Sequence, residues 1–187
     1  MTRDYWDNCN DAELVRQFKA GRAGAFDAFV RRFQDRVFRL ASVWLFDAHA
    51  AADASQEVFL RAYKGLPRFR FRSAPFTWLY RTTKYVCSEY NRKRRNEPLL
   101  HEPVDDSSNP PERQVAEADA AHRVREFVQL LPERQRDVVL LRVFEELSVA
   151  DTALAMGCRP GTVKALLHKA KQNLKPLLEE DNDQPQA

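Results

Sequence analysis

Basic and aromatic side chains alternate over residues 68–95, a combination typical of surfaces that bind single-stranded nucleic acid. The stretch opens with RFRFRS (68–73) and continues as a predicted helix over 74–94, with Pro75 in its first turn. Helical spacing places five polar or aromatic side chains together, opposite an apolar stripe: Trp78, Arg81, Thr82, Tyr85 and Arg92. Rings exposed on such a face would stack on unpaired bases. The alternative is that Trp78 and Tyr85 are core residues.

A second basic surface is predicted near the C-terminus, in a helix-turn-helix. Ser148 and Asp151 match a capping pattern for a helix that ends at Met156, Gly157 suits a left-handed turn, and Pro160 begins the next helix. The apolar stripe of that helix consists of Val163, Leu166, Leu167, Ala170 and Leu174. In such motifs the second helix enters the major groove of DNA. An amphipathic hairpin within a helical bundle is the alternative.

Charge is distributed unevenly along the 187 residues, although the formal net charge is only +3. Residues 61–95 contain eleven Lys or Arg and one acid, whereas residues 96–120 contain seven acids and one base. Residues 159–175 contain five Lys or Arg and no acid. Two basic blocks separated by an acidic block indicate two anion-binding surfaces on a hinged chain.

The remaining sequence predicts an all-α protein. Glycine is scarce, and apolar residues recur at helical spacing over 26–44 in one long amphipathic helix. Asn10 and Glu13 predict the start of a shorter helix that ends near Ala20, and a third helix is expected over about 51–64. Further helices are expected over about 112–130 and 132–145, and Pro176 is expected to interrupt the last one.

Residues 96–111 contain four prolines and no helical period, which predicts a flexible linker between two small helical domains. The expected organisation is a domain over 1–95, the linker over 96–111, a domain over 112–178 and an acidic tail over 179–187. Sixteen extended residues reach ~53 Å at ~3.3 Å per residue. This equals ~16 base pairs of DNA at ~3.4 Å each, so the two domains could occupy separate DNA elements.

Together these segments resemble the sigma-70 family of RNA polymerase sigma factors, in its extracytoplasmic-function (ECF) subgroup. QEVFLRAYKGLPRF (56–69) resembles the region 2 helix that docks on the clamp of RNA polymerase. FRSAPFTWLYRTTKYVCSEYNRKRR (71–95) resembles the part that melts and holds the −10 element. Residues 131–174 resemble region 4, which reads the −35 element. The resemblance spans roughly 11–178.

The resemblance implies roles for three groups of residues. Those expected to face the polymerase are Asp53, Gln56, Glu57 and Arg61. Those expected at the −10 strand are Phe69, Arg70, Arg72, Ser73, Trp78, Arg81, Thr82 and Tyr85, with Phe69, Thr82 and Tyr85 lining a pocket for a flipped base. Those expected at the −35 groove are Arg159, Thr162, Lys164, Ala165, His168 and Lys169.

The resemblance also implies partners, and the sequence differs from the usual family pattern at several positions. It implies core RNA polymerase and promoter DNA as partners, and it leaves an anti-sigma factor as a possible third partner that no feature of the sequence indicates. Phe71 and Arg72 replace a glycine and an acid that are common in the base-capturing loop of the family. Ala54, Ser55 and Thr152 stand where bulkier or branched apolar residues are usual.

Other functions are less compatible with the sequence. A LuxR-type regulator also has a helix-turn-helix of this kind, but it would need a parallel α/β receiver in the N-terminal half. A helical adapter that binds only protein would need neither basic block. An enzyme is not expected, since the four histidines are scattered, and Cys9, Cys87 and Cys158 show no metal-binding spacing. No cofactor is expected, and without a signal peptide or long apolar run the protein is expected in the cytoplasm, with no membrane insertion.

Overall fold

The structure, a computed structural model, describes residues 3–45, 47–96 and 126–182, and it describes side chains for 5–45, 47–95 and 126–179. Within these ranges the regular structure consists of helices without strands, which confirms the all-α prediction. Most of the predicted linker and of the helix expected over 112–130 lies outside the described residues. None of the described helices is long and apolar enough to cross a bilayer.

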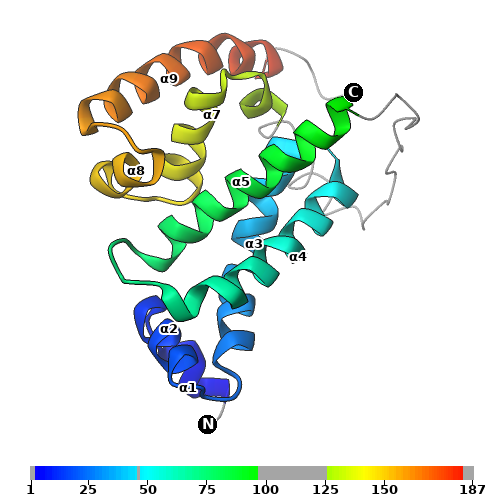
Figure 1. Cartoon of the computed structure of the whole chain (residues 1–187). Helices are drawn as coiled ribbons and strands as arrows, with labels where there is room; N and C mark the ends of the chain where they lie inside the picture. Colours follow the sequence, from blue (N-terminus) through cyan, green and yellow to red (C-terminus); the bar gives the residue numbers. More distant parts are fainter. Residues whose placement is uncertain (1–2, 46, 97–125, 183–187) are drawn as a thin grey trace.

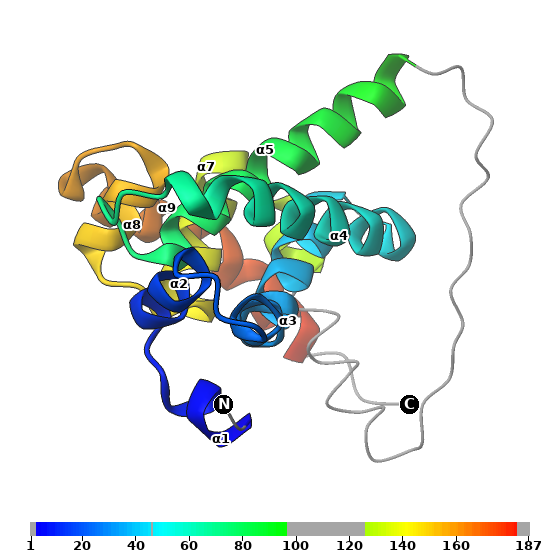
Figure 2. The same cartoon turned by 60° about the horizontal axis from the view of Figure 1, so that its bottom comes forward.

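The N-terminal helices α1 (Arg3–Asn8) and α2 (Asp11–Lys19) pack against the start of α3 (Ala25–Leu45). Asn10 caps α2 as predicted, because its side-chain oxygen accepts a hydrogen bond from the backbone N–H of Glu13 at 2.8 Å. Arg32 on α3 donates to the backbone carbonyls of Trp6, Asp7 and Cys9 at the end of α1. These bonds attach the first helix, which lies at the edge of the molecule in Figure 2, to the body of the protein.

Helices α3, α4 (Ala48–Gly65) and α5 (Pro75–Asn96) form a three-helix core. The stripe predicted along α3 is buried, and Phe29, Phe33 and Val37 are completely inaccessible to solvent. A short 3₁₀ turn, η1 (Leu66–Arg68), and the loop 69–74 connect α4 to α5. The basic C-terminal end of α5 extends beyond the rest of the bundle (Figure 2).

The C-terminal helices are α7 (Glu133–Val139), α8 (Val149–Met156) and α9 (Pro160–Asn182). Ser148 caps α8 and Gly157 adopts a left-handed φ of 61°, as predicted for the helix-turn-helix. One expectation is confirmed in its extent and one was wrong. The helix expected over 132–145 is present as α7 and a π-helical continuation, η2 (Leu140–Phe144). The interruption expected at Pro176 is absent, since α9 runs through this residue.

The C-terminal helices pack directly on the N-terminal bundle, with α5 between the two groups (Figure 1). Buried residues from both sides form one continuous core, in which Val128 and Leu131 join Val43 and Trp44. Polar contacts reinforce the junction. Glu145 binds Arg36 and Arg39 of α3, the latter at 3.3 Å, and the Gln129 side chain donates to the carbonyl of Ser42 at 3.1 Å.

A buried ion pair lies at the centre of this junction. Lys84 of α5 binds Asp137 of α7, whose side chain is 2% exposed, and it also reaches Glu133 at 2.9 Å. Burial raises the pKa of the Asp137 carboxyl, whereas the hydrogen bond from Lys84 lowers the pKa of Glu133. Trp44 and Tyr80 lie close to Asp137, although neither makes a hydrogen bond of full geometry with it. The charge of Lys84 therefore compensates a carboxylate that water does not reach.

Replacing Lys84 should open the junction. Lys84→Met keeps an unbranched apolar stem but leaves Asp137 buried without its cation, which costs about 3–5 kcal/mol. Separation of the two helical groups would relieve this cost by hydrating the carboxylate. We expect a larger radius of gyration in small-angle X-ray scattering at unchanged helix content by circular dichroism.

The double variant Lys84→Met/Asp137→Leu is the matched control. Apolar replacement of both members of a buried ion pair is often neutral or stabilising, so the double variant should be as compact as the wild type. A Lys84→Met protein with the wild-type radius of gyration would contradict a role of this ion pair in holding the two groups together.

Candidate nucleic-acid interface

The four residues expected to face a polymerase lie on α4. Asp53 and Gln56 are exposed, whereas Glu57 and Arg61 are half-buried because they bind each other at 2.6 Å. Leu60, one turn from Gln56 and Glu57, is 58% exposed. Leu60 was not among the residues expected on this surface, although an apolar residue four positions from Gln56 is a signal for it.

A salt-bridge network connects this part of α4 to the aromatic face of α5. Arg61 binds Glu89 of α5 at 2.7 Å, and its guanidinium lies 5.5 Å from the centre of the Tyr85 ring. Burial acts to raise the pKa of Glu89, but the bonds from Arg61 outweigh it and leave that pKa below its ordinary value. Glu57 and Arg61 are consequently coupled to Tyr85, while Asp53 and Gln56 lie outside this network of ion pairs.

The aromatic residues of α5 differ in exposure. Tyr85 is 60% exposed, so it is available for stacking. Trp78 is half-buried and packs on Gly65, where an added Cβ would lie 2.9 Å from its ring. Thr82, also half-buried, donates to the carbonyl of Trp78 at 3.1 Å. Trp78 therefore combines a structural contact with a partly open face.

The loop before α5 presents its basic side chains and buries one of its aromatics. Arg70 and Arg72 are exposed and Ser73 is half-buried. Phe69 is 7% exposed and packs against Trp78, with ring centres 5.7 Å apart. The structure therefore places Phe69 beneath the surface, where it supports the loop, rather than beside Thr82 and Tyr85 on an open wall.

Arg81 contacts the C-terminal helices. Its Nε donates to the carbonyl of Ala155 at 3.1 Å, and its terminal NH₂ group donates to the carbonyl of Leu154. Both carbonyls belong to the last turn of α8, where helix carbonyls lack intrahelical partners. This arginine, expected at the −10 strand, is thus engaged by the first helix of the helix-turn-helix.

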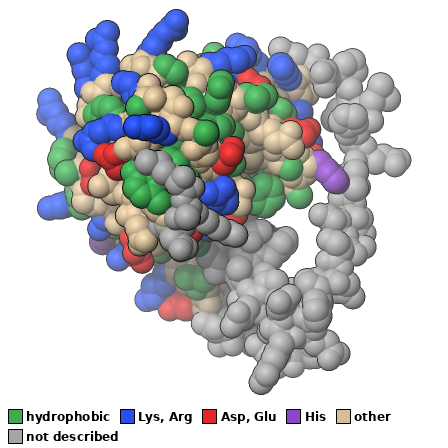
Figure 3. Space-filling view, turned by 90° about the horizontal axis from the view of Figure 1, so that it is seen from below, with side chains coloured by type: hydrophobic (Ala, Val, Ile, Leu, Met, Phe, Trp, Pro, Cys, Tyr) green, Lys and Arg blue, Asp and Glu red, His purple; other side chains and the backbone are tan. Residues whose placement is uncertain are grey.

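The second helix of that motif, α9, has its two faces as predicted. Val163 and Ala170 are completely buried, and Leu166 and Leu167 are half-buried. The six side chains expected at a DNA groove are all exposed: Arg159, Thr162, Lys164, Ala165, His168 and Lys169. Figure 3 views the molecule from the opposite end, that of α1 and α2, where further Lys and Arg side chains project along one margin. The packing of α9 therefore leaves its reading face accessible.

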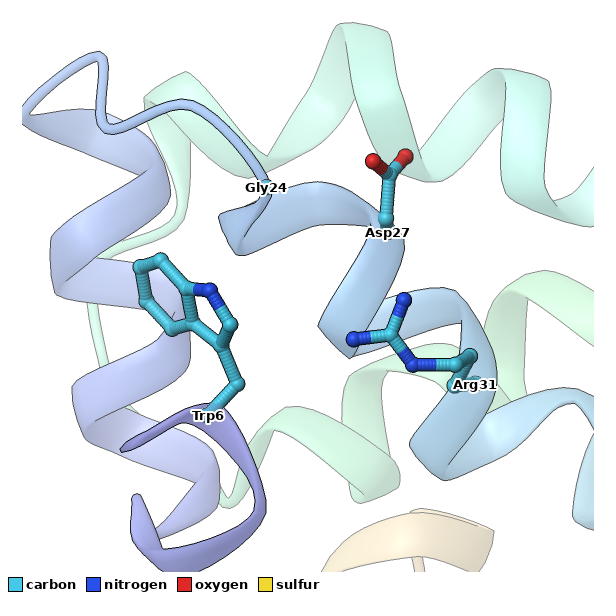
Figure 4. Close-up of a pocket in the computed structure, with 4 residues that line it drawn as sticks. All are labelled: Trp6, Gly24, Asp27 and Arg31. Carbon is cyan, nitrogen blue, oxygen red and sulfur yellow. The ribbon is translucent and has the colours of Figure 1, made fainter. Parts of the chain in front are cut away.

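Other features of the described residues do not add a catalytic or metal site. No cluster of His, Cys, Asp or Glu within the described ranges could hold a metal ion. Burial raises the pKa of the Cys87 thiol to about 12. A hollow of about 380 Å³ is lined by Trp6, Gly24, Asp27 and Arg31 (Figure 4), and its lining comes from the α1–α3 end, not from α5 or α9.

Comparison with known proteins assigns the N-terminal and the C-terminal helical groups to two different family models. Residues 29–97 match the family model for sigma-70 region 2, and residues 121–174 match the model for sigma-70 region 4. The region 2 match excludes the α/β receiver that a LuxR-type regulator would need.

Similar proteins cover nearly the whole chain. The RNA polymerase sigma-H factor of Pseudomonas aeruginosa is 33% identical over 91% of this chain and 96% of its own length. The ECF RNA polymerase sigma factor SigM of Mycobacterium tuberculosis is 32% identical over 90% of this chain and 85% of its own length. The fold is similar to that of CnrH, solved in complex with the cytosolic domain of CnrY, with a TM-score of 0.71, 20% identity and coverage of 91% and 98% of the two chains. The chain belongs to the sigma-70 family, in the ECF group of RNA polymerase sigma factors.

Proposed function

We propose that this sigma factor directs RNA polymerase to promoters in the cytoplasm by dividing the work among three surfaces. The exposed side of α4 around Gln56 and Leu60 binds core polymerase. The reading face of α9 recognises the −35 element as duplex, and α5 with the loop 69–73 holds the melted −10 strand. The observation that carries this assignment is the exposure of Tyr85, of Arg159 and of the five residues expected at the groove on α9, all on the two segments that match regions 2 and 4.

The energetics of melting fit this assignment. Stacking on an aromatic side chain stabilises an unpaired base by about 1–3 kcal/mol, and extruding a base from a duplex costs a few kcal/mol. Tyr85 and the partly open face of Trp78 could capture one or two bases, and Arg70 and Arg72 could neutralise the adjoining phosphates. Such a surface stabilises a melted strand without contributing any chemical step.

Full engagement of the −10 strand, unlike binding at the −35 element, requires the junction to open. We propose that the two units are residues 1–95 and 112–178, joined by the linker 96–111. In the arrangement seen in the structure, the closed form, the two units touch and Arg81 is bound to α8, so Arg81 is not available to the −10 strand. Opening releases Arg81 for the −10 strand.

Run-off transcription tests the proposed function directly. The protein is added to core RNA polymerase with fragments of the source genome, and new promoter-specific transcripts are expected. A gel-shift with and without core polymerase should show strong promoter binding only when polymerase is present. Equal promoter binding by the free chain would indicate a classical DNA-binding regulator instead.

We predict that Lys164→Ala and Lys169→Ala weaken −35 recognition. A lost base contact should cost about 1–3 kcal/mol and relax the preference at one position. A lost phosphate contact should weaken binding to all sequences alike and reduce the salt dependence. Footprinting and transcription from promoters with single −35 changes distinguish the two cases.

Lys175→Ala is the matched control for these variants. Lys175 lies at the far end of α9, where it pairs with Glu179 at 3.6 Å. Its replacement should change promoter binding little. If all three lysine variants behaved like the wild type, the assignment of α9 to the −35 groove would be wrong.

We predict that melting and polymerase binding are separable by mutation. Tyr85→Ala should leave core binding intact and slow open-complex formation, because it removes a stacking surface worth about 1–3 kcal/mol. A premelted bubble template should partly restore its activity, since the cost of unpairing is then removed. Asp53→Ala with Gln56→Ala should instead weaken core association, and the bubble should not help.

The choice of residues matters for this comparison. Glu57 and Arg61 are unsuitable because the Arg61 network reaches Tyr85, so their replacement would disturb both surfaces. Trp78→Ala is also unsuitable as the first variant, because Trp78 packs on Gly65 and Phe69. A folded Tyr85→Ala protein that opens linear promoters at the wild-type rate would refute the role of this face.

A further inference from the structure

Arg36 and Arg39 form a pair of cations on one side of α3, at the junction between the two halves of the chain. They lie about one helical turn apart, and both bind Glu145, Arg39 at 3.3 Å. The side chain of Glu145 is 3% exposed, whereas those of Arg36 and Arg39 are 26% and 49% exposed. The junction therefore encloses the acid, while the two guanidinium groups lie at its rim.

Helix α5 continues this basic face. The guanidinium of Arg36 lies 3.4 Å from the centre of the Phe76 ring, in the first turn of α5. Further along α5, Arg81 and Lys84 are three positions apart, so they point to the same side of the helix. Both bind the C-terminal helices. We call Arg36, Arg39, Arg81 and Lys84 the junction cations.

The groups that the junction cations bind on the C-terminal half are acids and carbonyl oxygens. Two of the three acids are almost completely buried, since the side chains of Asp137 and Glu145 are 2% and 3% exposed, and Glu133 is the accessible one at 69%. Arg81 binds carbonyls in the last turn of α8, where the helix dipole carries partial negative charge. The C-terminal half thus presents negative groups in fixed positions, as the phosphates of a nucleic acid backbone do.

Opening of the junction leaves the junction cations without these partners. A cation that gives up an ion pair can recover the interaction from another anion, and double-stranded DNA carries one negative charge per ~1.7 Å of its axis. The face that bears the cations is turned toward the C-terminal helices (Figure 1). Since the proposed function assigns Arg81 to the −10 strand, the other cations of this face would lie beside the duplex that runs from that strand toward the −35 element.

We propose that the junction cations form a phosphate-binding site for the duplex between the −10 and −35 elements, and that the acids of the C-terminal half occupy this site in the closed form. The residues that this site adds to the DNA-binding surface are Arg36, Arg39 and Lys84. DNA and the C-terminal half then compete for the same cations, so the duplex itself favours the open form. The proposal rests on the proposed function, because it requires a promoter that both halves engage.

The test removes the two arginines of α3 without leaving a buried acid unpaired. Glu145→Gln keeps both cations and deletes the charge that they bind, and the triple variant Arg36→Gln/Arg39→Gln/Glu145→Gln deletes all three charges. Each protein is assembled with core polymerase, and its affinity for a fluorescent duplex promoter transcribed by the wild type is measured over a range of salt concentrations. Arg31→Gln is the control for loss of an arginine from α3, because Arg31 is exposed and lines the hollow beside Trp6.

The triple variant should depend less on salt than Glu145→Gln. Each lost phosphate contact lowers the slope of log affinity against log salt concentration by about 0.9, so the two slopes should differ by about 1.8. Between about 50 and 200 mM salt, the affinity of the triple variant should therefore fall about 12-fold less. Glu145→Gln should bind at least as tightly as the wild type, because the competing acid is lost, and Arg31→Gln should keep the wild-type slope. Equal slopes for Glu145→Gln and the triple variant would overturn the proposal.

The buried ion pair provides an independent comparison. Asp137→Leu keeps Lys84, and Lys84→Met/Asp137→Leu removes it, so both proteins have the same apolar side chain in place of Asp137. The double variant should have a slope about 0.9 units shallower than that of Asp137→Leu. Circular dichroism and core binding are measured first. If the arginine variants fail to fold or to bind core polymerase, this second comparison decides, and equal slopes would again overturn the proposal.

Neutral phosphates locate the contact on the DNA. A promoter is prepared in which methylphosphonates replace the phosphates of the duplex adjoining the −10 element on the side of the −35 element. This promoter should bind less tightly to the Glu145→Gln holoenzyme, whereas the triple variant should be affected less, because it lacks the cations that those phosphates bind. Equal weakening of the two proteins would overturn the proposal, since the arginines would then act elsewhere.

The outcome also separates this proposal from the proposed function. If the slopes are equal while the wild-type holoenzyme transcribes and Tyr85→Ala slows opening, the phosphate site between the elements does not exist and the proposed function stands. If the wild-type holoenzyme neither binds nor opens promoters, the proposed function fails and the phosphate site fails with it.

Discussion

The ion pair between Lys84 and Asp137 constrains the whole arrangement of this protein. A carboxylate that is 2% exposed needs a compensating cation, and the cation comes from the other half of the chain. The region 4 helices therefore carry a buried charge that is paired with a cation of the region 2 bundle. When the two halves separate, Asp137 must be hydrated and Lys84 loses its partner. The ion pair therefore favours one specific packing of the two halves, which is the closed form.

The closed form affects the three proposed surfaces unequally. The α9 face and the outer side of α4 are exposed, so a −35 element and the polymerase could approach without any rearrangement. Arg81, in contrast, is bound to the last turn of α8. The step that depends on the −10 strand is thus the one that the closed form restrains, and binding of polymerase to α4 could precede opening.

The sequence predicted those features that depend on local rules. The caps at Asn10 and Ser148, the left-handed Gly157 and the buried stripe of α3 follow from spacing and residue type, and the structure confirms them. The packing of the two halves on each other was not predicted, because the partners of Lys84 and Arg81, which include Asp137 and Ala155, lie 49 or more positions away. Phe71 was identified only as a departure from a glycine, since Arg16 and Lys19 of α2, whose charged groups lie over its ring, are more than 50 positions away.

Opening must be driven by differential binding. A ligand that binds both forms equally shifts nothing, and a change from 1% to 99% open requires a preference of about 10⁴-fold, or ~5.5 kcal/mol. Core polymerase and promoter DNA together can supply such a preference only through contacts that the closed form lacks. The freed Arg81 and the simultaneous occupation of two DNA elements are contacts of this kind, whereas the α4 and α9 surfaces are accessible in both forms. The α4 and α9 surfaces, which are exposed in both forms, would therefore determine the affinity for polymerase and DNA. The contacts that form only after opening would determine how far the junction opens.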